Sequence, residues 1–313
     1  MLRQAQEIDG KITEEANDDR AEDQMSVNKY LIRLCSQDKA KPLPSEEMVK
    51  RLIEKGADIH AKDSNGLTSF HWCCNTNKIE TAKLLLKLGA AINSRDNDGR
   101  TPLHFPCHSG SVDIVKMLLE EGADVNCKSN SGRTPLHKAC SNGQIEVAKM
   151  LLAKNADVLA KDSSGRTAIH WCCLNGHTDI FSLLVENGAN ICETNDYGWT
   201  PLHKACYNGH KAICLLLVSE GADIDCEDND GDTPLDIVES DDLKEEILSA
   251  RQKHLSWARR RNFMRYLNVQ YSAVIDQATG EPAAKHMAPS AFKALKPVDE
   301  VMIVLHRHIV SFI

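Results

Sequence analysis

The chain has 313 residues and a formal net charge of −8. Residues 251–313 carry ten Lys or Arg and four Asp or Glu, a net charge of +6, so residues 1–250 carry a net charge of −14. An acidic body argues against general nucleic-acid binding, which needs a basic face to neutralise phosphates. The acidic N-terminus does not resemble a signal or transit peptide and no apolar stretch approaches the ~20 residues of a membrane-spanning helix, so we expect a cytoplasmic or nuclear protein without a membrane partner.

Residues 1–25 are acidic and weakly apolar. We predict that they are disordered, because such segments bury too little apolar surface to fold. Two helices are expected next, one near Val27–Cys35 and one over Glu46–Lys55 that begins after Ser45 as its cap. A long loop, Gln37–Pro44, separates them.

Six threonines follow at a fixed spacing of 33 residues, and the residues around them repeat as well. In the first five units a histidine stands three positions after the threonine, whereas the sixth unit has Asp236 there. A fixed period of this length predicts a stacked array of identical supersecondary units, each in contact only with its neighbours. These threonines are Thr68, Thr101, Thr134, Thr167, Thr200 and Thr233.

One unit, residues 132–165, shows how the period is built. Thr134 is placed to cap a short helix, and Pro135 suits its first turn, where a missing N–H costs nothing. A second helix begins near Gln144, and Asn155 then takes the left-handed position where the other units have glycine. Since neither helix can bury its apolar side alone, stacking is predicted to form one core from Leu85, Leu118, Leu151, Leu184 and Leu217.

The repeated pattern Gly-x-Thr-Pro-Leu-His-x-Ala-Cys-x-x-Gly, followed by a Leu-Leu pair and Gly-Ala-Asp, resembles the ankyrin repeat over roughly residues 27–240. The resemblance implies an all-α solenoid of antiparallel helix pairs, with projecting β-hairpin loops and a concave surface made of hairpins and first helices. It also implies that the chain binds other proteins and carries no chemistry of its own. We therefore expect an ankyrin-repeat array over residues 26–240, with about six repeats and a degenerate end cap.

Residues 241–313 lie beyond the resemblance and are predicted to form a helical, basic extension. One helix is expected over residues 243–267, and another over Val298–Ile313, where apolar residues fall at helical spacing. The run Arg259–Arg261 is interpreted first as a solvated helix face and second as a site for an anionic partner or a nuclear signal.

The variable position before each repeat threonine is the first candidate for recognition, because in the family it lies on the concave face. Three successive arginines followed by a tryptophan would suit an extended acidic or carboxylate-bearing ligand. These residues are Arg100, Arg133, Arg166 and Trp199. The competing interpretation is that the arginines pair within the array with Asp96, Asp98 and Asp162.

The resemblance also points to the position after each small-residue pair, held by Asn75, His108, Ser141, Leu174 and Tyr207. Tyr197 and Trp199 precede the last of these, and aromatic residues are the usual anchors of protein interfaces. The predicted protein-binding site therefore includes Tyr197, His108, Ser141, Leu174 and Tyr207. The aromatic residues directly after the histidine are interpreted as partly buried spacers; they are Trp72, Phe105 and Trp171.

Residues that could suggest chemistry recur with the 33-residue period and are interpreted as scaffold. A neutral imidazole at the repeated histidine can bond the cap threonine on one side and an adjacent turn on the other. The repeated cysteines are expected to be buried free thiols, because stacked helices ~8–10 Å apart are too distant for a disulfide. His71-x-Cys73-Cys74 and His170-x-Cys172-Cys173 lack zinc-site spacing. We predict no enzyme activity, metal, cofactor or small-molecule substrate.

The sequence therefore predicts a non-catalytic protein-interaction module or scaffold that binds one or more proteins. Two alternatives stay open. One is a substrate-recognition adaptor of a ubiquitin ligase, because Leu295–Ile313 loosely resembles F-box or SOCS-box helices. The other is a constitutive subunit of a larger assembly.

Overall fold

The structure is a computed structural model that describes residues 20–36 and 46–256. Contacts divide the chain into two units, Met1–Lys244 and Glu245–Ile313. The second unit is described only over residues 245–256, which are helical. Among the described residues, no helix is both long enough and apolar enough to cross a membrane.

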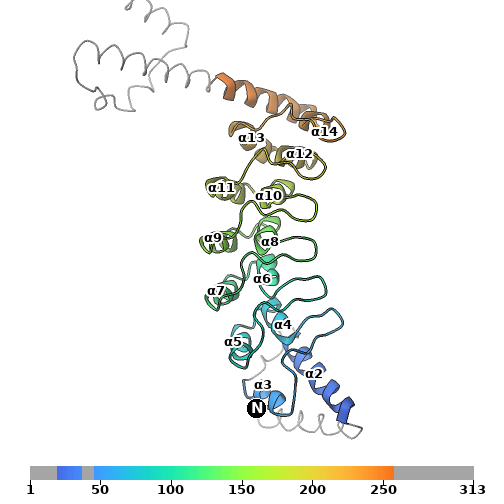
Figure 1. Ribbon diagram of the computed structural model, residues 1–313. Coiled ribbons are helices and arrows are strands. Elements are labelled where there is room, and N and C mark those ends of the chain that lie inside the picture. The colour runs from blue at the N-terminus through green and yellow to red at the C-terminus, as the bar shows by residue number, and fades with distance from the viewer. Residues whose placement is uncertain (1–19, 37–45, 257–313) are drawn as a thin grey trace, which may run out of the picture. The chain divides into compact units, whose positions relative to one another are not determined.

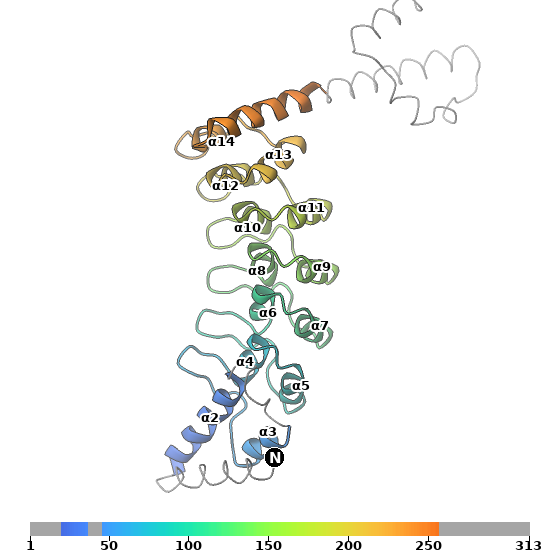
Figure 2. The same cartoon turned by 180° about the vertical axis from the view of Figure 1, so that it is seen from behind.

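The first unit is built from two parallel rows of short helices (Figure 1). The first helices of the repeats form one row, which consists of α4 (Ser69–Asn75), α6 (His104–Ser109), α8 (Pro135–Ser141), α10 (Ala168–Asn175) and α12 (Pro201–Tyr207). The second helices form the other row, which consists of α5 (Ile79–Lys87), α7 (Val112–Glu120), α9 (Ile145–Ala153), α11 (Thr178–Glu186) and α13 (Lys211–Ser219). Seen from behind, the two rows remain separate (Figure 2).

The two ends of this array differ from its repeats. At the N-terminal end, α2 (Arg20–Ser36) and α3 (Glu46–Glu54) stand before α4, and at the other end α14 (Pro234–Ile237) follows the sixth threonine. The prediction of disorder over residues 1–25 is wrong for residues 20–25, because α2 already begins at Arg20. Its C-terminal half is anchored by Leu31 and Cys35, both fully buried, so the helix extends outward from a packed end.

The apolar core runs between the two rows of helices, as the period predicts. The five leucines that recur at 33-residue spacing are all fully buried: Leu85, Leu118, Leu151, Leu184 and Leu217. Burying a leucine side chain stabilises a fold by about 1.5–3 kcal/mol, so this column alone is a large contribution to the array. The all-α repeat solenoid predicted from the sequence is therefore confirmed.

The repeat threonines begin the first helices. Thr134 accepts a hydrogen bond from the backbone N–H of His137, and Pro135 takes the first turn, as predicted. α6 departs from this pattern and starts later, at His104. The reason is Pro106, which has no N–H to donate to the carbonyl of Pro102 one turn earlier. Asn155 has the left-handed conformation expected of it, with φ of 61°.

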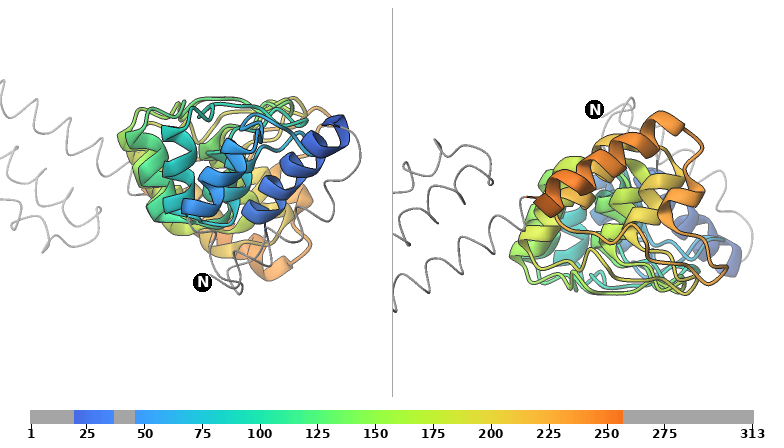
Figure 3. Two further views of the ribbon diagram at one scale, coloured as in Figure 1. Left: turned by 90° about the horizontal axis from the view of Figure 1, so that it is seen from below. Right: turned by 90° about the horizontal axis from the view of Figure 1, so that it is seen from above.

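The loops between repeats project from one side of the helices and superpose when viewed along the stack (Figure 3). Each loop is closed by a backbone hydrogen bond such as Asp96 N to Arg100 O at 3.0 Å. Neighbouring loops are joined at their tips by one more, such as Asn97 N to Asn65 O at 3.0 Å. We call the side formed by the first helices and these loops the hairpin face; its loops are residues 62–67, 95–100, 128–133, 161–166, 194–199 and 227–232.

All twelve cysteines are free thiols, as expected. Cys206 and Cys214, on the two helices of one repeat, have Sγ atoms 3.8 Å apart. Of the predicted C-terminal extension, the described part is helical through residue 256. The remainder of the predicted helix 243–267, the run Arg259–Arg261 and Val298–Ile313 lie outside the described residues.

Candidate functional site

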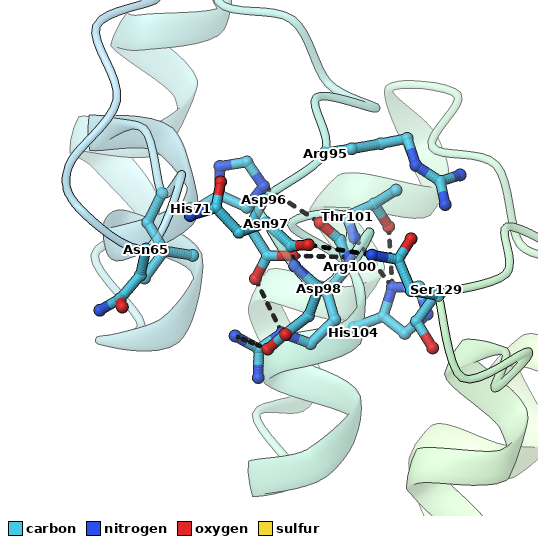
Figure 4. A network of polar contacts seen from close by, with 12 residues as sticks. Asn65, His71, Arg95, Asp96, Asn97, Asp98, Arg100, Thr101, His104 and Ser129 are labelled. Carbon is cyan, nitrogen blue, oxygen red and sulfur yellow. Dashed lines mark hydrogen bonds and ion pairs between the residues drawn. The ribbon is translucent and has the colours of Figure 1, made fainter.

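The repeated histidines are part of the scaffold. In each, Nδ1 accepts the backbone N–H of the cap threonine at 3.0–3.2 Å. The proton therefore lies on Nε2, which donates to a backbone carbonyl of the next loop, as His104 does to Arg133 O at 3.0 Å. Both predicted bonds are confirmed. Figure 4 shows His71 and His104 beside the second loop, and the five histidines are His71, His104, His137, His170 and His203.

Burial keeps these imidazoles neutral. It lowers the pKa of His104, His137 and His170 to about 4, although the backbone carbonyl that each bonds acts in the opposite direction. Burial likewise lowers the pKa of His71 and His203. A neutral ring with both nitrogens bonded inside the protein is a structural group, and it has no free nitrogen to offer a substrate.

A loop aspartate organises the second hairpin and neutralises Arg100. Asp96 Oδ1 accepts the backbone N–H groups of Asp98 and Arg100 at 3.0 and 2.7 Å, and Oδ2 accepts from Arg100 Nε at 2.7 Å (Figure 4). A second carboxylate, Asp98, lies 3.1 Å from Arg100 Nη2. The pairing of Arg100 with these aspartates, one of the two interpretations of the sequence, is thus what the structure contains.

The fourth hairpin repeats this arrangement around Asp162. Its Oδ2 accepts from Arg166 Nε at 3.1 Å and from Trp171 Nε1 at 3.2 Å. Burial would raise the pKa of Asp162, but the backbone N–H groups of Ser164 and Arg166 and the Arg166 charge together lower it. The carboxylate is therefore ionised, and its contacts extend from its own loop to α10.

The third hairpin has no such carboxylate, because Ser129 stands where the second and fourth have aspartate. Arg133 reaches instead to Asp162 of the next loop, with Nε and Oδ2 3.9 Å apart. That Nε is buried and has no hydrogen-bond partner among the described residues. Its guanidinium lies 3.9 Å from the centre of the Trp171 ring, and the Arg166 guanidinium lies 4.3 Å from the same ring. Arg133 and Arg166 thus share one carboxylate, that of Asp162, and one indole ring, that of Trp171.

Two lysines on the same face were missed as site residues. Lys138 and Lys204 directly follow the repeated histidines, are half-buried, and make no ion pair among the described residues. Lys204 Nζ lies 3.9 Å from the centre of the Trp199 ring. The signal was present in the sequence, because these lysines alternate with the aromatic residues Trp72, Phe105 and Trp171 at one repeat position. Of those aromatics, Trp171 is buried and the other two are half-buried.

The predicted aromatic residues gather at the fifth loop and α12. Trp199 packs against Tyr207, with ring centres 5.4 Å apart, and stacks on His203 at 6.2 Å. Tyr197 and Tyr207 are each 63% exposed, although aromatic side chains of this size usually bury most of their surface. The loop carboxylate is again missing here, since Asn195 replaces it and its Nδ2 is buried without a partner among the described residues.

The other predicted site residues lie in the last turns of the first helices. His108 is exposed, and Ser141 and Leu174 are half-buried. Their backbone carbonyls accept side-chain hydrogen bonds from the following repeat; the donors are Gln144 at 3.4 Å, His177 at 3.3 Å and His210 at 2.9 Å. The carbonyls therefore join the repeats, and only the side chains remain for a partner.

The two motifs that imitate metal ligands are buried in the scaffold. His71 is bonded on both ring nitrogens, and burial raises the pKa of Cys73, Cys74 and Cys172 well above the ordinary value of a thiol. Within the described ranges, no three His, Cys, Asp or Glu side chains come together in a group that could hold a metal ion.

The comparisons with known proteins agree with this architecture. A family model described as ankyrin repeats (three copies) matches residues 39–129, 121–195, 160–228 and 187–241, which together span more than half of the chain. No curated protein matches the chain.

Proposed function

This chain belongs to the ankyrin-repeat family, and from that premise we propose that it is a non-catalytic module that binds a partner protein through its hairpin face. Ankyrin repeats generally mediate protein–protein interaction and are typically non-catalytic. The repeated histidines support this proposal, because their ring nitrogens are used inside the array.

The observation that carries the proposal is the pair of exposed tyrosines. Tyr197 and Tyr207 stand beside Trp199, each 63% exposed, on an otherwise well-packed array. Tyrosine offers a large contact area with few rotatable bonds and is enriched among the residues that dominate interface energies. A solenoid also holds these rings in place before binding, so little conformational entropy is lost on association.

The remaining predicted residues are proposed as the surrounding contacts: Arg100, Arg133, Arg166, His108, Ser141 and Leu174. Arg100 and Arg166 are already paired with aspartates, so we expect them to contribute less than the tyrosines. Truncating a central aromatic anchor typically weakens an interface by about 2 kcal/mol or more, whereas a paired charge at the rim contributes little.

The test is affinity purification with the full chain and with Tyr197→Ala/Tyr207→Ala. Both rings are exposed, so this variant should keep the fold, and we expect it to lose partners that the unmodified chain recovers. A matched control is Leu88→Ala/Val112→Ala, which truncates two exposed apolar side chains at the second helices, each 39% exposed. Recovery of the same partners by the tyrosine variant would show that Tyr197 and Tyr207 do not anchor the partner.

A further inference from the structure

Positive charge on the hairpin face is unevenly neutralised along the array. Loops two and four carry aspartates that pair with their own arginines at 2.7 and 3.1 Å. Loops three and five have Ser129 and Asn195 at that position, so neither supplies a carboxylate there, and the one acidic residue of loop five is the exposed Asp196. The middle of the face therefore has more cations than carboxylates to pair with them.

The exposed loop cations Lys62, Arg95 and Lys128 donate to backbone carbonyls of the next loop. Three half-buried cations have no carboxylate of their own among the described residues, and we call them the cationic patch: Arg133, Lys138 and Lys204. Arg133 shares Asp162 with Arg166, which lies closer to that carboxylate by 0.8 Å, the difference between 3.9 and 3.1 Å. Lys138 makes no ion pair within the described part of the chain, and the carboxylate that acts on it, Asp98, is already bound to Arg100.

A neighbouring positive charge acts on each member of the patch. Burial is the main cause that lowers the pKa of Lys138, and the charges of Arg133 and Arg100 lower it further. Burial is also the main cause that lowers the pKa of Lys204 and of Arg133, and the charge of Arg166 lowers both further. Half-buried cations that lie among like charges and have no carboxylate of their own within the described part of the chain are stabilised by an anion brought from outside, because such a pair forms where water is partly excluded.

Resting on the proposed function, we infer that the cationic patch binds an acidic segment of the partner protein, with the carboxylates between Arg133, Lys138 and Lys204. Tyr197, Trp199 and Tyr207 then flank the segment at the fifth loop. The patch spans three successive repeats, about 20 Å at helix spacings of ~10 Å. An extended chain covers that distance with about six residues.

A peptide fits this surface better than a nucleic acid does. The patch is short and ends at a loop of opposite sign, since residues 223–232 carry six Asp or Glu and no Lys or Arg. Residues 1–250 as a whole carry −14, which opposes the approach of a long polyanion. A short acidic peptide, unlike a long nucleic acid, places its negative charges against the cationic patch alone and does not extend over the acidic parts of the surface.

The probe is fluorescein-labelled octaglutamate, titrated with the full chain and followed by fluorescence anisotropy. We expect saturable binding that weakens as salt is added. Lys138→Gln/Lys204→Gln should weaken it about tenfold or more, which corresponds to about 1.4 kcal/mol, because the variant removes two of the three charged contacts. The matched control Lys116→Gln/Lys154→Gln removes two exposed lysines at the second helices and should bind like the unmodified chain.

Arg133→Gln provides a second variant with the same expected loss, and circular dichroism of each variant shows that the fold is kept. The inference is overturned if octaglutamate does not bind, or if the two double variants weaken binding equally. It is also overturned if octathymidylate binds as tightly as octaglutamate through the same lysines, or if sedimentation shows that the patch instead joins two copies of this chain through residues 223–232.

The peptide titration and the affinity purification together distinguish a failure of this inference from a failure of the proposed function. If a partner is recovered through Tyr197 and Tyr207 but octaglutamate does not bind, the hairpin face is the interface and the acidic chemistry is wrong. If octaglutamate binds through the patch and the tyrosine variant recovers every partner, the acidic chemistry stands and the proposed role of the tyrosines is wrong.

Discussion

At the scale of single residues, the repeated histidines decide how the protein responds to acid. Each ring accepts a backbone N–H at Nδ1, which protonation would abolish. Burial adds to the effect, because a charged imidazole in the core has lost its hydration. The sixth unit shows what the position requires, since Asp236 accepts the same N–H of Thr233 at 2.9 Å from an exposed site.

We predict that acid destabilises the array over the pH range in which these histidines are protonated in the unfolded chain but neutral in the folded one. The folded pKa of His104, His137 and His170 is about 4, against 6.5 when unfolded, so between these values the unfolded chain binds more protons. Their contribution is complete above pH 6.5 and is lost as the pH falls toward 4. Urea unfolding should show a lower free energy of unfolding at about pH 5 than at about pH 7.5, by about 1.4 kcal/mol per pH unit for each histidine well below 6.5.

His137→Gln is the control for this effect. Glutamine can accept the Thr134 N–H as the third residue of a capping box, yet it does not titrate. The variant should therefore show a weaker pH dependence than the unmodified chain. A free energy of unfolding that stays constant from about pH 7.5 to about pH 5, or that rises, would contradict the assignment of neutral buried histidines.

At the scale of helices and loops, the repeats are joined by side chains that bond across the boundary between units. His177 Nε2 bonds Ser141 O at 3.3 Å and passes directly beside Gly143. A Cβ on Gly143 would stand 2.9 Å from His177 Cε1, whereas one on Gly122 would meet nothing within 4 Å. Both glycines have left-handed backbones, with φ of 72° and 84°.

This pair of glycines allows the inter-repeat bond to be measured. Gly143→Ala and Gly122→Ala both place an L-residue in the left-handed region, which costs about 1–2 kcal/mol. Only Gly143→Ala also displaces His177, so we expect it to cost about 1 kcal/mol more, the net value of one hydrogen bond. Thermal unfolding of the two variants tests this, and equal losses would mean that the bond to Ser141 contributes nothing.

At the scale of the whole molecule, the array is a one-dimensional stack. An interior helix such as α10 packs against both α8 and α12, whereas α14 packs against α12 among the named helices. α8 buries five of its residues, whereas α14 buries Pro234 alone. Stability should therefore be highest in the middle and decrease toward both ends.

Hydrogen exchange measured by mass spectrometry checks this expectation. Backbone amides of α8, α9, α10 and α11 should exchange most slowly, and those of α3 and α14 should exchange fastest within the array, because opening an end breaks one interface instead of two. Leu151→Ala, which removes a fully buried side chain, should cost about 2–5 kcal/mol and speed exchange on both sides of α9. Uniform protection along the array would show that it unfolds only as a whole.

Much of the candidate site could be foreseen from sequence because its positions repeat. The period located the loop position of Arg133 and the exposed position of Tyr207, and both lie on the hairpin face. What the period did not reveal was charge balance. Arg133 has its carboxylate in the next loop, at Asp162, and Lys138 has none among the described residues. Neither fact follows from residue type at one position.

The sequence by itself determined the all-α repeat solenoid, the capped first helices, the left-handed Asn155 and the burial of the repeated histidines, leucines and cysteines. These features depend on residues a few positions apart, or on one period that applies everywhere, so local chemistry is enough to specify them. The tertiary structure alone decided that Arg133 shares the carboxylate of the next loop with Arg166, and that Lys138 has no carboxylate partner among the described residues. Those outcomes depend on contacts between successive units, where the identity of a neighbour's side chain decides whether a charge is paired or left to a partner.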